Sequence, residues 1–314
     1  MNSHFADAAA GEAPRESTPG ARIGAGGTLA MLVRREFWEH RALWIAPLVV
    51  AALMVVSALV ASVKYRLGHG DMHHDGSDGM TMFSVMQSAV STPLSLVTLI
   101  VLSFYLLDCL YAERKDRSIL FWKSLPVSDN LTVLSKLLVA LLVVPLGVFA
   151  LGLLVSLSFV GIWELNAAFG RLPPIPGWDT LAWLKGEMAL LACVMVGVLW
   201  YAPFAAYLLV VSAWARRSPF LWATVPVVLA PLLERMAFGT TYLWKLLAYR
   251  TYGIWHTLFP YPRLGHGRAD ALASMFGQLR FGAAFSDIDM WLGLAVTAAL
   301  VFAAIRLRRY RDDT

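Results

Sequence analysis

Six long apolar stretches constrain the fold of this chain more than any other feature of its sequence. Each has 18 to 26 residues with at most two charges, and together they cover residues 44–63, 89–110, 137–160, 188–213, 219–238 and 288–305. An α-helix of about 20 apolar residues spans the hydrocarbon core of a bilayer. Unbroken apolar runs favour helices over the alternating pattern of a membrane β-barrel. We therefore predict an all-α, polytopic integral membrane protein with six transmembrane helices.

Composition and charge agree with this prediction. The chain is 58% hydrophobic and only 15% charged, with a mean hydropathy of +0.62, whereas a soluble domain is roughly 45–50% apolar. The net charge of +5 is spread over short basic clusters that flank the apolar runs. Such clusters are topology signals rather than a nucleic-acid-binding stripe. The expected surroundings are membrane lipid, with no nucleic-acid partner.

The distribution of Lys and Arg predicts the orientation of the helices. Thirteen basic residues flank the runs on one side, and the two short loops on the other side, 64–87 and 161–187, hold four. Positive charge accumulates on the cytoplasmic side. We predict a multi-pass protein of the bacterial inner (plasma) membrane with both termini in the cytoplasm.

Four of the regions outside the spans have distinctive compositions. Residues 1–28 have the composition of a disordered cytoplasmic tail without a signal peptide, and 306–314 form a basic tail. Residues 29–43 have an apolar face interrupted by Glu36 and His40, typical of an amphipathic connecting helix in the headgroup plane or of a simple extension of the first span. The aromatic-rich segment 239–287 is expected on the outer side, as interfacial or re-entrant helices or as a plain loop.

The segment 112–128, between the second and third spans, has the most informative pattern. It begins with a charged run and continues with Leu120, Phe121 and Trp122 before Leu125 and Pro126. A short amphipathic helix of this kind fits a groove on another protein. Pro126 is expected to end it, and Ser128 or Asp129 to cap the helix that becomes the third span.

This segment resembles the one that joins the second and third of six spans in the ABC-2 type transporter permease family. The residues that carry the resemblance are Glu113, Leu125, Pro126, Val127, Ser128 and Lys136. The resemblance implies a coupling helix that docks on a nucleotide-binding subunit, preceded by a connecting helix before the first span. Its implied ATPase-coupling residues are Glu113, Arg117, Leu120, Phe121, Trp122, Leu125 and Pro126. The chain departs from the family at Arg117, where a glycine is common, and this change bears on the choice of partner.

No P-loop sequence occurs in the chain. We therefore expect no catalytic residue and no cofactor here, with ATP bound by a separate P-loop ABC ATPase. Because such ATPases work in pairs, the chain is expected to form a homodimer or a heterodimer with a second permease. Together these features predict the transmembrane permease subunit of an ABC-2 type exporter, with its direction taken from the resemblance and its substrate unidentified.

The first outer loop is rich in possible metal ligands: His69, Asp71, His73 and His74. Adjacent histidines among flexible neighbours are not a preorganised site, and the same residues make a well-hydrated loop. We predict no metal site.

Charged residues in or directly beside the runs lie near the ends of the runs. Asp108, Lys136, Glu187 and Asp289 are each expected to reach an interface by snorkelling. This pattern provides no buried proton relay and so disfavours an ion-coupled secondary carrier. An accessory membrane protein that anchors a partner complex is the other alternative.

The polar residues of the second span either line a substrate path or pack helices. The two cysteines, Cys109 and Cys193, are expected at different depths in the membrane and without a disulfide.

Overall fold

The computed structural model describes residues 25–66, 79–116, 128–172, 179–258 and 280–310, and the regular secondary structure in these ranges is helical. The elements are α1 (Ala25–Glu39), α2 (Ala42–Arg66), α3 (Gly79–Asp108), α4 (Tyr111–Lys115), α6 (Asp129–Leu138), the π-helical turn η1 (Val139–Val143), α7 (Val144–Ala168), α8 (Thr180–Trp214), α9 (Pro219–Phe238), α10 (Tyr242–Leu258), α12 (Phe281–Ser286) and α13 (Ile288–Tyr310).

The predicted spans are confirmed as helices. Six helical stretches in the described ranges are long and apolar enough to cross a membrane: α2, α3 with α4, α6 through α7, α8, α9 and α13. Most extend a few residues beyond the predicted apolar runs, because helical hydrogen bonding continues past the apolar boundary. In α9, Pro226 and Pro231 lie inside the helix without ending it.

The third span begins as predicted and contains one irregularity. The Ser128 side chain caps α6 by accepting a hydrogen bond of 3.3 Å from the backbone N–H of Leu131. The π-helical turn η1 follows directly, and Pro145 comes two residues after it. Proline removes one helical N–H and crowds the carbonyl four residues earlier, and a wider turn relieves that crowding. A local π turn therefore accommodates Pro145 within the continuous helix formed by α6, η1 and α7.

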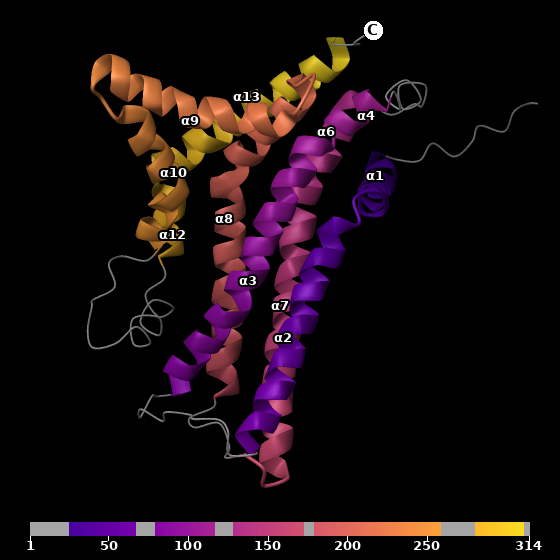
Figure 1. The fold of residues 1–314 in the computed structure, drawn as a ribbon, viewed down its shortest axis with the longest axis vertical. Helices are drawn as coiled ribbons and strands as arrows, with labels where there is room; N and C mark the ends of the chain where they lie inside the picture. Colours follow the sequence, from indigo (N-terminus) through magenta and orange to yellow (C-terminus); the bar gives the residue numbers. More distant parts are fainter. Residues whose placement is uncertain (1–24, 67–78, 117–127, 173–178, 259–279, 311–314) are drawn as a thin grey trace, which may run out of the picture.

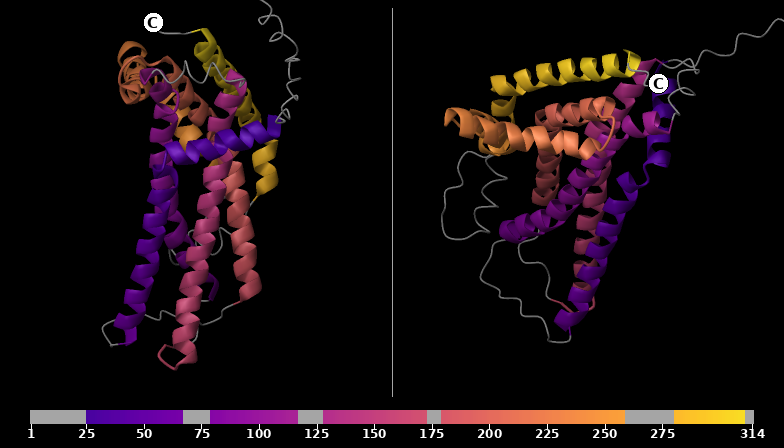
Figure 2. Two further views of the ribbon diagram at one scale, coloured as in Figure 1. Left: turned by 90° about the vertical axis from the view of Figure 1, so that its right-hand side faces the viewer. Right: turned by 45° about the horizontal axis from the view of Figure 1, so that its top comes forward.

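Four long helices form the body of the molecule (Figure 1). α2, α3, α7 and α8 run along the long axis, whereas α9 runs across it and α13 rises obliquely along α8. The left view of Figure 2 shows α1 also lying across the axis. We call the end of the bundle that holds α1, α4, the start of α6 and the last turns of α13 the junction end. The ends of α2 and α7 lie at the opposite end.

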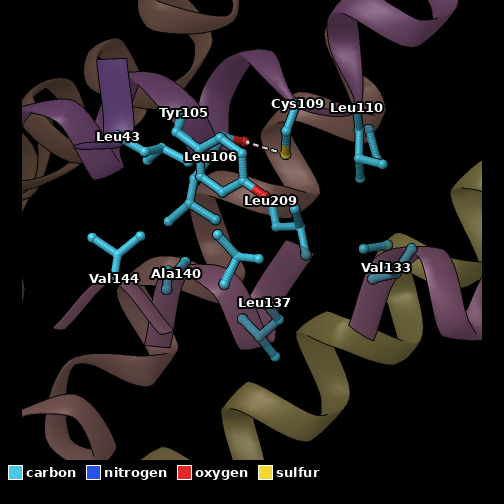
Figure 3. Packing of buried hydrophobic residues seen from close by; sticks show 14 residues of the cluster. Leu43, Tyr105, Leu106, Cys109, Leu110, Val133, Leu137, Ala140, Val144 and Leu209 are labelled. Carbon is cyan, nitrogen blue, oxygen red and sulfur yellow. Dashed lines mark hydrogen bonds between the residues drawn. The ribbon is translucent and has the colours of Figure 1, made fainter. Parts of the chain in front are cut away.

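The main apolar core lies at the junction end. Buried side chains from α2, α3, α6, η1, α7, α8 and α13 meet there, among them Leu43, Tyr105, Leu137 and Leu209 (Figure 3). Cys109, between α3 and α4, is buried in this cluster, whereas Cys193 is on α8 and outside the cluster. Both cysteines are free thiols, as predicted. The packing holds the ends of five spans against one another, which positions the charged groups described below.

A second cluster joins α8, α10, α12 and α13 around the fully buried Trp200. The guanidinium of Arg250 lies over the Trp200 ring, 4.3 Å from its centroid. It donates hydrogen bonds to the carbonyl oxygens of Trp200, at 2.8 Å, and of Asp289, at 3.0 Å. Arg250 thus links three helices, and Gly293 leaves the space that its guanidinium occupies.

Gly293→Ala is expected to destabilise the protein by about 1–3 kcal/mol, because the added methyl group would overlap the Arg250 guanidinium. Thermal unfolding in detergent, followed by tryptophan fluorescence, measures the change. Gly161→Ala is the matched control, since a Cβ at this helical position meets nothing within 4 Å. A melting temperature that rises equally in both variants would contradict the role of Arg250.

Candidate functional site

Four charged side chains from four helices meet at the junction end. Glu36 comes from α1, Glu113 from α4, Lys136 from α6 and Arg308 from α13. Their exposed fractions are 0%, 5%, 0% and 5%. We call these four residues the buried ion network.

Glu113 is the centre of the network. Its Oε1 atom is 3.1 Å from the Lys136 ammonium and accepts a hydrogen bond of 3.1 Å from Arg35, while its Oε2 atom accepts one from Arg308. Arg308 also donates to the Asp129 carboxylate at 3.0 Å. One carboxylate therefore connects α1, α4, α6 and α13.

Glu36 provides the second carboxylate. Its Oε1 accepts a hydrogen bond of 2.8 Å from Lys136, and its Oε2 accepts one of 3.0 Å from the Tyr105 hydroxyl of α3. His40, the residue directly after α1, has its Nε2 atom 3.8 Å from the same Oε2 atom. These contacts explain why Glu36 and His40 interrupt the apolar face of the connecting helix: both point into the protein.

Two groups outside the membrane-spanning helices, Arg35 on α1 and His40 directly after it, have shifted pKa values. Burial lowers the pKa of His40, and the charge of Glu36 opposes this shift. For Arg35, burial alone would lower the pKa, but its hydrogen bond to Glu39 and the charges of Glu39 and Glu113 raise it overall. Near neutral pH, His40 is therefore a neutral neighbour of the network and Arg35 a permanent cation at its edge.

The prediction that Lys136 snorkels to an interface is wrong. Its ammonium is fully buried and is paired with two carboxylates. Removing a charge from water costs several kcal/mol unless ion pairs and hydrogen bonds replace the lost hydration. The partners come from distant parts of the sequence, so position near a span end could not show that the charge is paired inside.

The α3–α4 junction is also tied to α8. The Ser212 hydroxyl accepts hydrogen bonds of 3.1 Å from the backbone N–H groups of Leu110 and Tyr111. Arg114 donates to the carbonyl oxygens of Ser212, at 2.7 Å, and Ala215, at 2.9 Å. These carbonyls belong to the C-terminal end of α8, where helical partners are missing. α4 is thus fixed to a fifth element beside the network.

The predicted coupling residues are only partly described. Glu113 is described, and its carboxylate points inward to three cations, so it acts on any docked partner only through its neighbours. The other six, Arg117, Leu120, Phe121, Trp122, Leu125 and Pro126, lie outside the described residues. The described residues on either side of them, Asp116 and Ser128, belong to the junction end.

The structure does not test the metal candidates of the first outer loop. His69, Asp71, His73 and His74 lie outside the described residues. Glu36, Glu39 and His40 have potential ligand atoms within 4.8 Å of one another. Both oxygens of Glu36 already bind Lys136 and Tyr105, so a metal ion would have to displace a buried lysine. We assign no metal here.

Sequence reasoning also missed Glu187. The prediction that it reaches an interface is wrong, because it is only 3% exposed and accepts a hydrogen bond of 3.2 Å from Gln87 of α3. Gln87 is itself buried in α3, two residues before the predicted second span, and an amide beside an apolar run is the signal that could have suggested a polar partner. Asp108, by contrast, is exposed as expected.

Comparisons with models of protein families, with curated proteins and with solved structures find no match for this chain.

Lys136→Met is expected to destabilise the protein by about 3–5 kcal/mol, because it leaves Glu36 buried without its cation. The measurement is the free energy of unfolding in detergent with increasing denaturant. Lys115→Met removes an exposed lysine of neighbouring α4 and is expected to change stability by less than about 1 kcal/mol. Equal effects of the two substitutions would show that the network is not a stabilising element.

Proposed function

We propose that this chain is the membrane subunit of an ATP-driven exporter of the ABC-2 type, with a separate P-loop ATPase that docks on segment 112–128. The buried ion network carries the proposal. It binds together the two ends of that segment, since Glu113 lies near its start and Asp129 directly follows it. A displacement of the docked segment would therefore act on several helices at once.

The contacts define a path for such a displacement. From α4, Glu113 reaches α1, α6 and α13, while Arg114 reaches the end of α8. The helix that carries Lys136, α6, continues directly into η1 and α7. Coupling of this kind needs rigid elements that move together. In this proposal the network keeps the junction end rigid, and it is a positioning device rather than a docking surface.

In this proposal the residues of the docking segment have roles different from those of the network. Leu120, Phe121, Trp122 and Leu125 supply the apolar contact with the ATPase, and Arg117 supplies charge at its rim. Pro126 ends the docking helix. ATP is bound and hydrolysed by the partner, and two copies of this chain, or one copy and a second permease, accompany two ATPases in the bacterial plasma membrane.

One alternative gains support from the structure. Glu187 and the network are buried ionisable groups in or beside the spans, and such groups serve ion-coupled carriers as proton or cation sites. A carrier would transport substrate on an ion gradient without ATP. An accessory membrane protein would support neither form of transport.

The tagged chain, solubilised from native membranes, is expected to copurify with a stoichiometric P-loop ATPase that hydrolyses ATP. Leu125→Asp is expected to abolish this association while the chain still inserts, because a charge would be placed in the apolar contact. Mass spectrometry and an ATPase assay of the eluate measure both effects.

Phe169→Asp is the control, because it makes the same kind of change at an exposed position just after α7, at the opposite end of the bundle. It should keep the ATPase. Absence of any ATPase from the wild-type eluate would refute the proposed function, and retention of the ATPase by Leu125→Asp would refute the docking site.

A further inference from the structure

A pocket of about 610 Å³ lies at the junction end, where the connection between α1 and α2 faces α3 and the first residues of α9. Its size is within the range of roughly 300–1,000 Å³ that is usual for small-molecule sites. Four of its lining residues share one face of α3, because they are three or four positions apart: Val101, Phe104, Tyr105 and Asp108. α3 therefore forms one wall of the pocket, and the starts of α2 and α9 complete it.

Aromatic surface residues indicate that this pocket lies at the level of the lipid headgroups. Trp38 and Trp44 are exposed on either side of the α1–α2 connection, and Trp214 and Trp222 are exposed on either side of the start of α9. Tryptophan is enriched where acyl chains meet the headgroups. α1, which leads to the pocket, lies across the axis of the bundle (Figure 2), as a helix in the headgroup plane does. Phospholipid headgroups are therefore the expected neighbours of the pocket.

Two charged side chains of the pocket are open to a ligand. Arg41 and Asp108 both line the pocket and are exposed, and the ion pairs of the described residues include neither of them. Glu39 also lines the pocket, but its two oxygens already bind Arg35, at 2.6 and 3.1 Å. His40 is a neutral group near pH 7, as described above. The pocket thus offers a ligand one positive and one negative group.

The apolar lining of the pocket lies further from the junction end than the charged lining. α3 runs toward that end, so Val101 lies about 10 Å before Asp108, at 1.5 Å per residue. Phe104, between these two residues, and Phe220 of α9 are 59% and 55% exposed, and their stacked rings have centroids 6.2 Å apart. A charged group followed by apolar side chains matches the order of headgroup and acyl chains in a phospholipid.

We infer that this pocket binds a phospholipid whose headgroup carries a primary ammonium group, such as phosphatidylethanolamine. In this arrangement Arg41 binds the phosphate, and Asp108 accepts hydrogen bonds from the ammonium group. The acyl chains lie against Phe104 and Phe220, where the burial of apolar surface adds to the affinity. The site does not depend on an ATPase, so it goes beyond the proposed function.

The two charges distinguish this headgroup from other common ones. A choline headgroup has the same charges, but its quaternary ammonium group has no N–H to donate to Asp108. A glycerol headgroup offers no positive charge, and its lipid is a net anion beside the carboxylates of Glu39 and Asp108. The site is therefore expected to prefer the ethanolamine lipid to both.

The test uses the full chain in detergent, titrated with dioleoyl phosphatidylethanolamine, phosphatidylcholine or phosphatidylglycerol. Native mass spectrometry measures the affinity for the first bound lipid. The wild type is expected to bind the ethanolamine lipid roughly tenfold more tightly than the other two, because a charge-assisted hydrogen bond to Asp108 distinguishes them. The preference is modest because Asp108 is exposed, and solvent screens its charge.

Two substitutions separate the roles of the charges. Asp108→Asn should remove the preference, because it weakens binding of the ethanolamine lipid alone, roughly tenfold. Arg41→Gln should instead weaken binding of all three lipids to a similar extent, since each of them carries the phosphate. Glu164→Gln and Arg34→Gln are the matched controls, because both residues are exposed and do not line the pocket. They should leave the affinities and the preference unchanged.

Ala42→Phe tests the space rather than the charges. Ala42 is exposed and lines the pocket at the start of α2, so a larger side chain there occupies the pocket without entering the apolar core. It should reduce binding of the ethanolamine lipid although Arg41 and Asp108 are both intact.

Two results would overturn the inference: equal affinity of the wild type for the three lipids, or an unchanged preference in Asp108→Asn. The first is also the result expected if a second copy of this chain covers the pocket, and the native masses would then show a dimer without a preferred lipid. In either case copurification of an ATPase would still support the proposed function. Absence of the ATPase with a retained lipid preference would instead refute the proposed function and leave the site standing.

Discussion

The arrangement of the junction end depends on the pairing of two buried carboxylates with buried cations. Glu36 and Glu113 share the ammonium group of Lys136, and Glu113 also binds Arg308. An unpaired charge in this environment costs several kcal/mol, so each partner restricts where the others can lie. Helices that are distant in the sequence, α1, α4, α6 and α13, are held in one relative arrangement for this reason, and the apolar cluster around Leu137 and Leu209 packs directly beside it.

The buried ion network and the Gln87–Glu187 pair differ in how completely their polar groups are paired. The network at the junction end is saturated with partners, which favours rigidity and the transfer of movement between helices. The Gln87–Glu187 pair is less complete, because one buried carboxylate oxygen of Glu187 has no hydrogen-bond partner among the described residues. In the proposed exporter, the network is the site that receives force from an ATPase.

Hydrophobicity and local rules predicted much of the fold from the sequence. The six helices follow from runs such as 219–238, where α9 has the predicted bounds, and Ser128 caps α6 as its position before a helix suggested. The burial of Lys136 and Glu187 could not be predicted in the same way, because each depends on a partner about 100 residues away, Glu36 and Gln87 respectively. The interruption of the apolar face of α1 by Glu36 was a visible sign of the network, but it did not identify the lysine.

A double-mutant cycle between Glu36 and Lys136 tests most directly whether the network holds the junction end together. The free energies of unfolding of Glu36→Gln, Lys136→Met and the double variant are compared with that of the wild type. The account predicts that the double variant is more stable than the sum of the single effects implies, by about 1.5–3 kcal/mol, because removing both charges leaves Glu113 paired with Arg308 and Arg35. Additive single effects would mean that the two side chains do not interact, and would contradict the account.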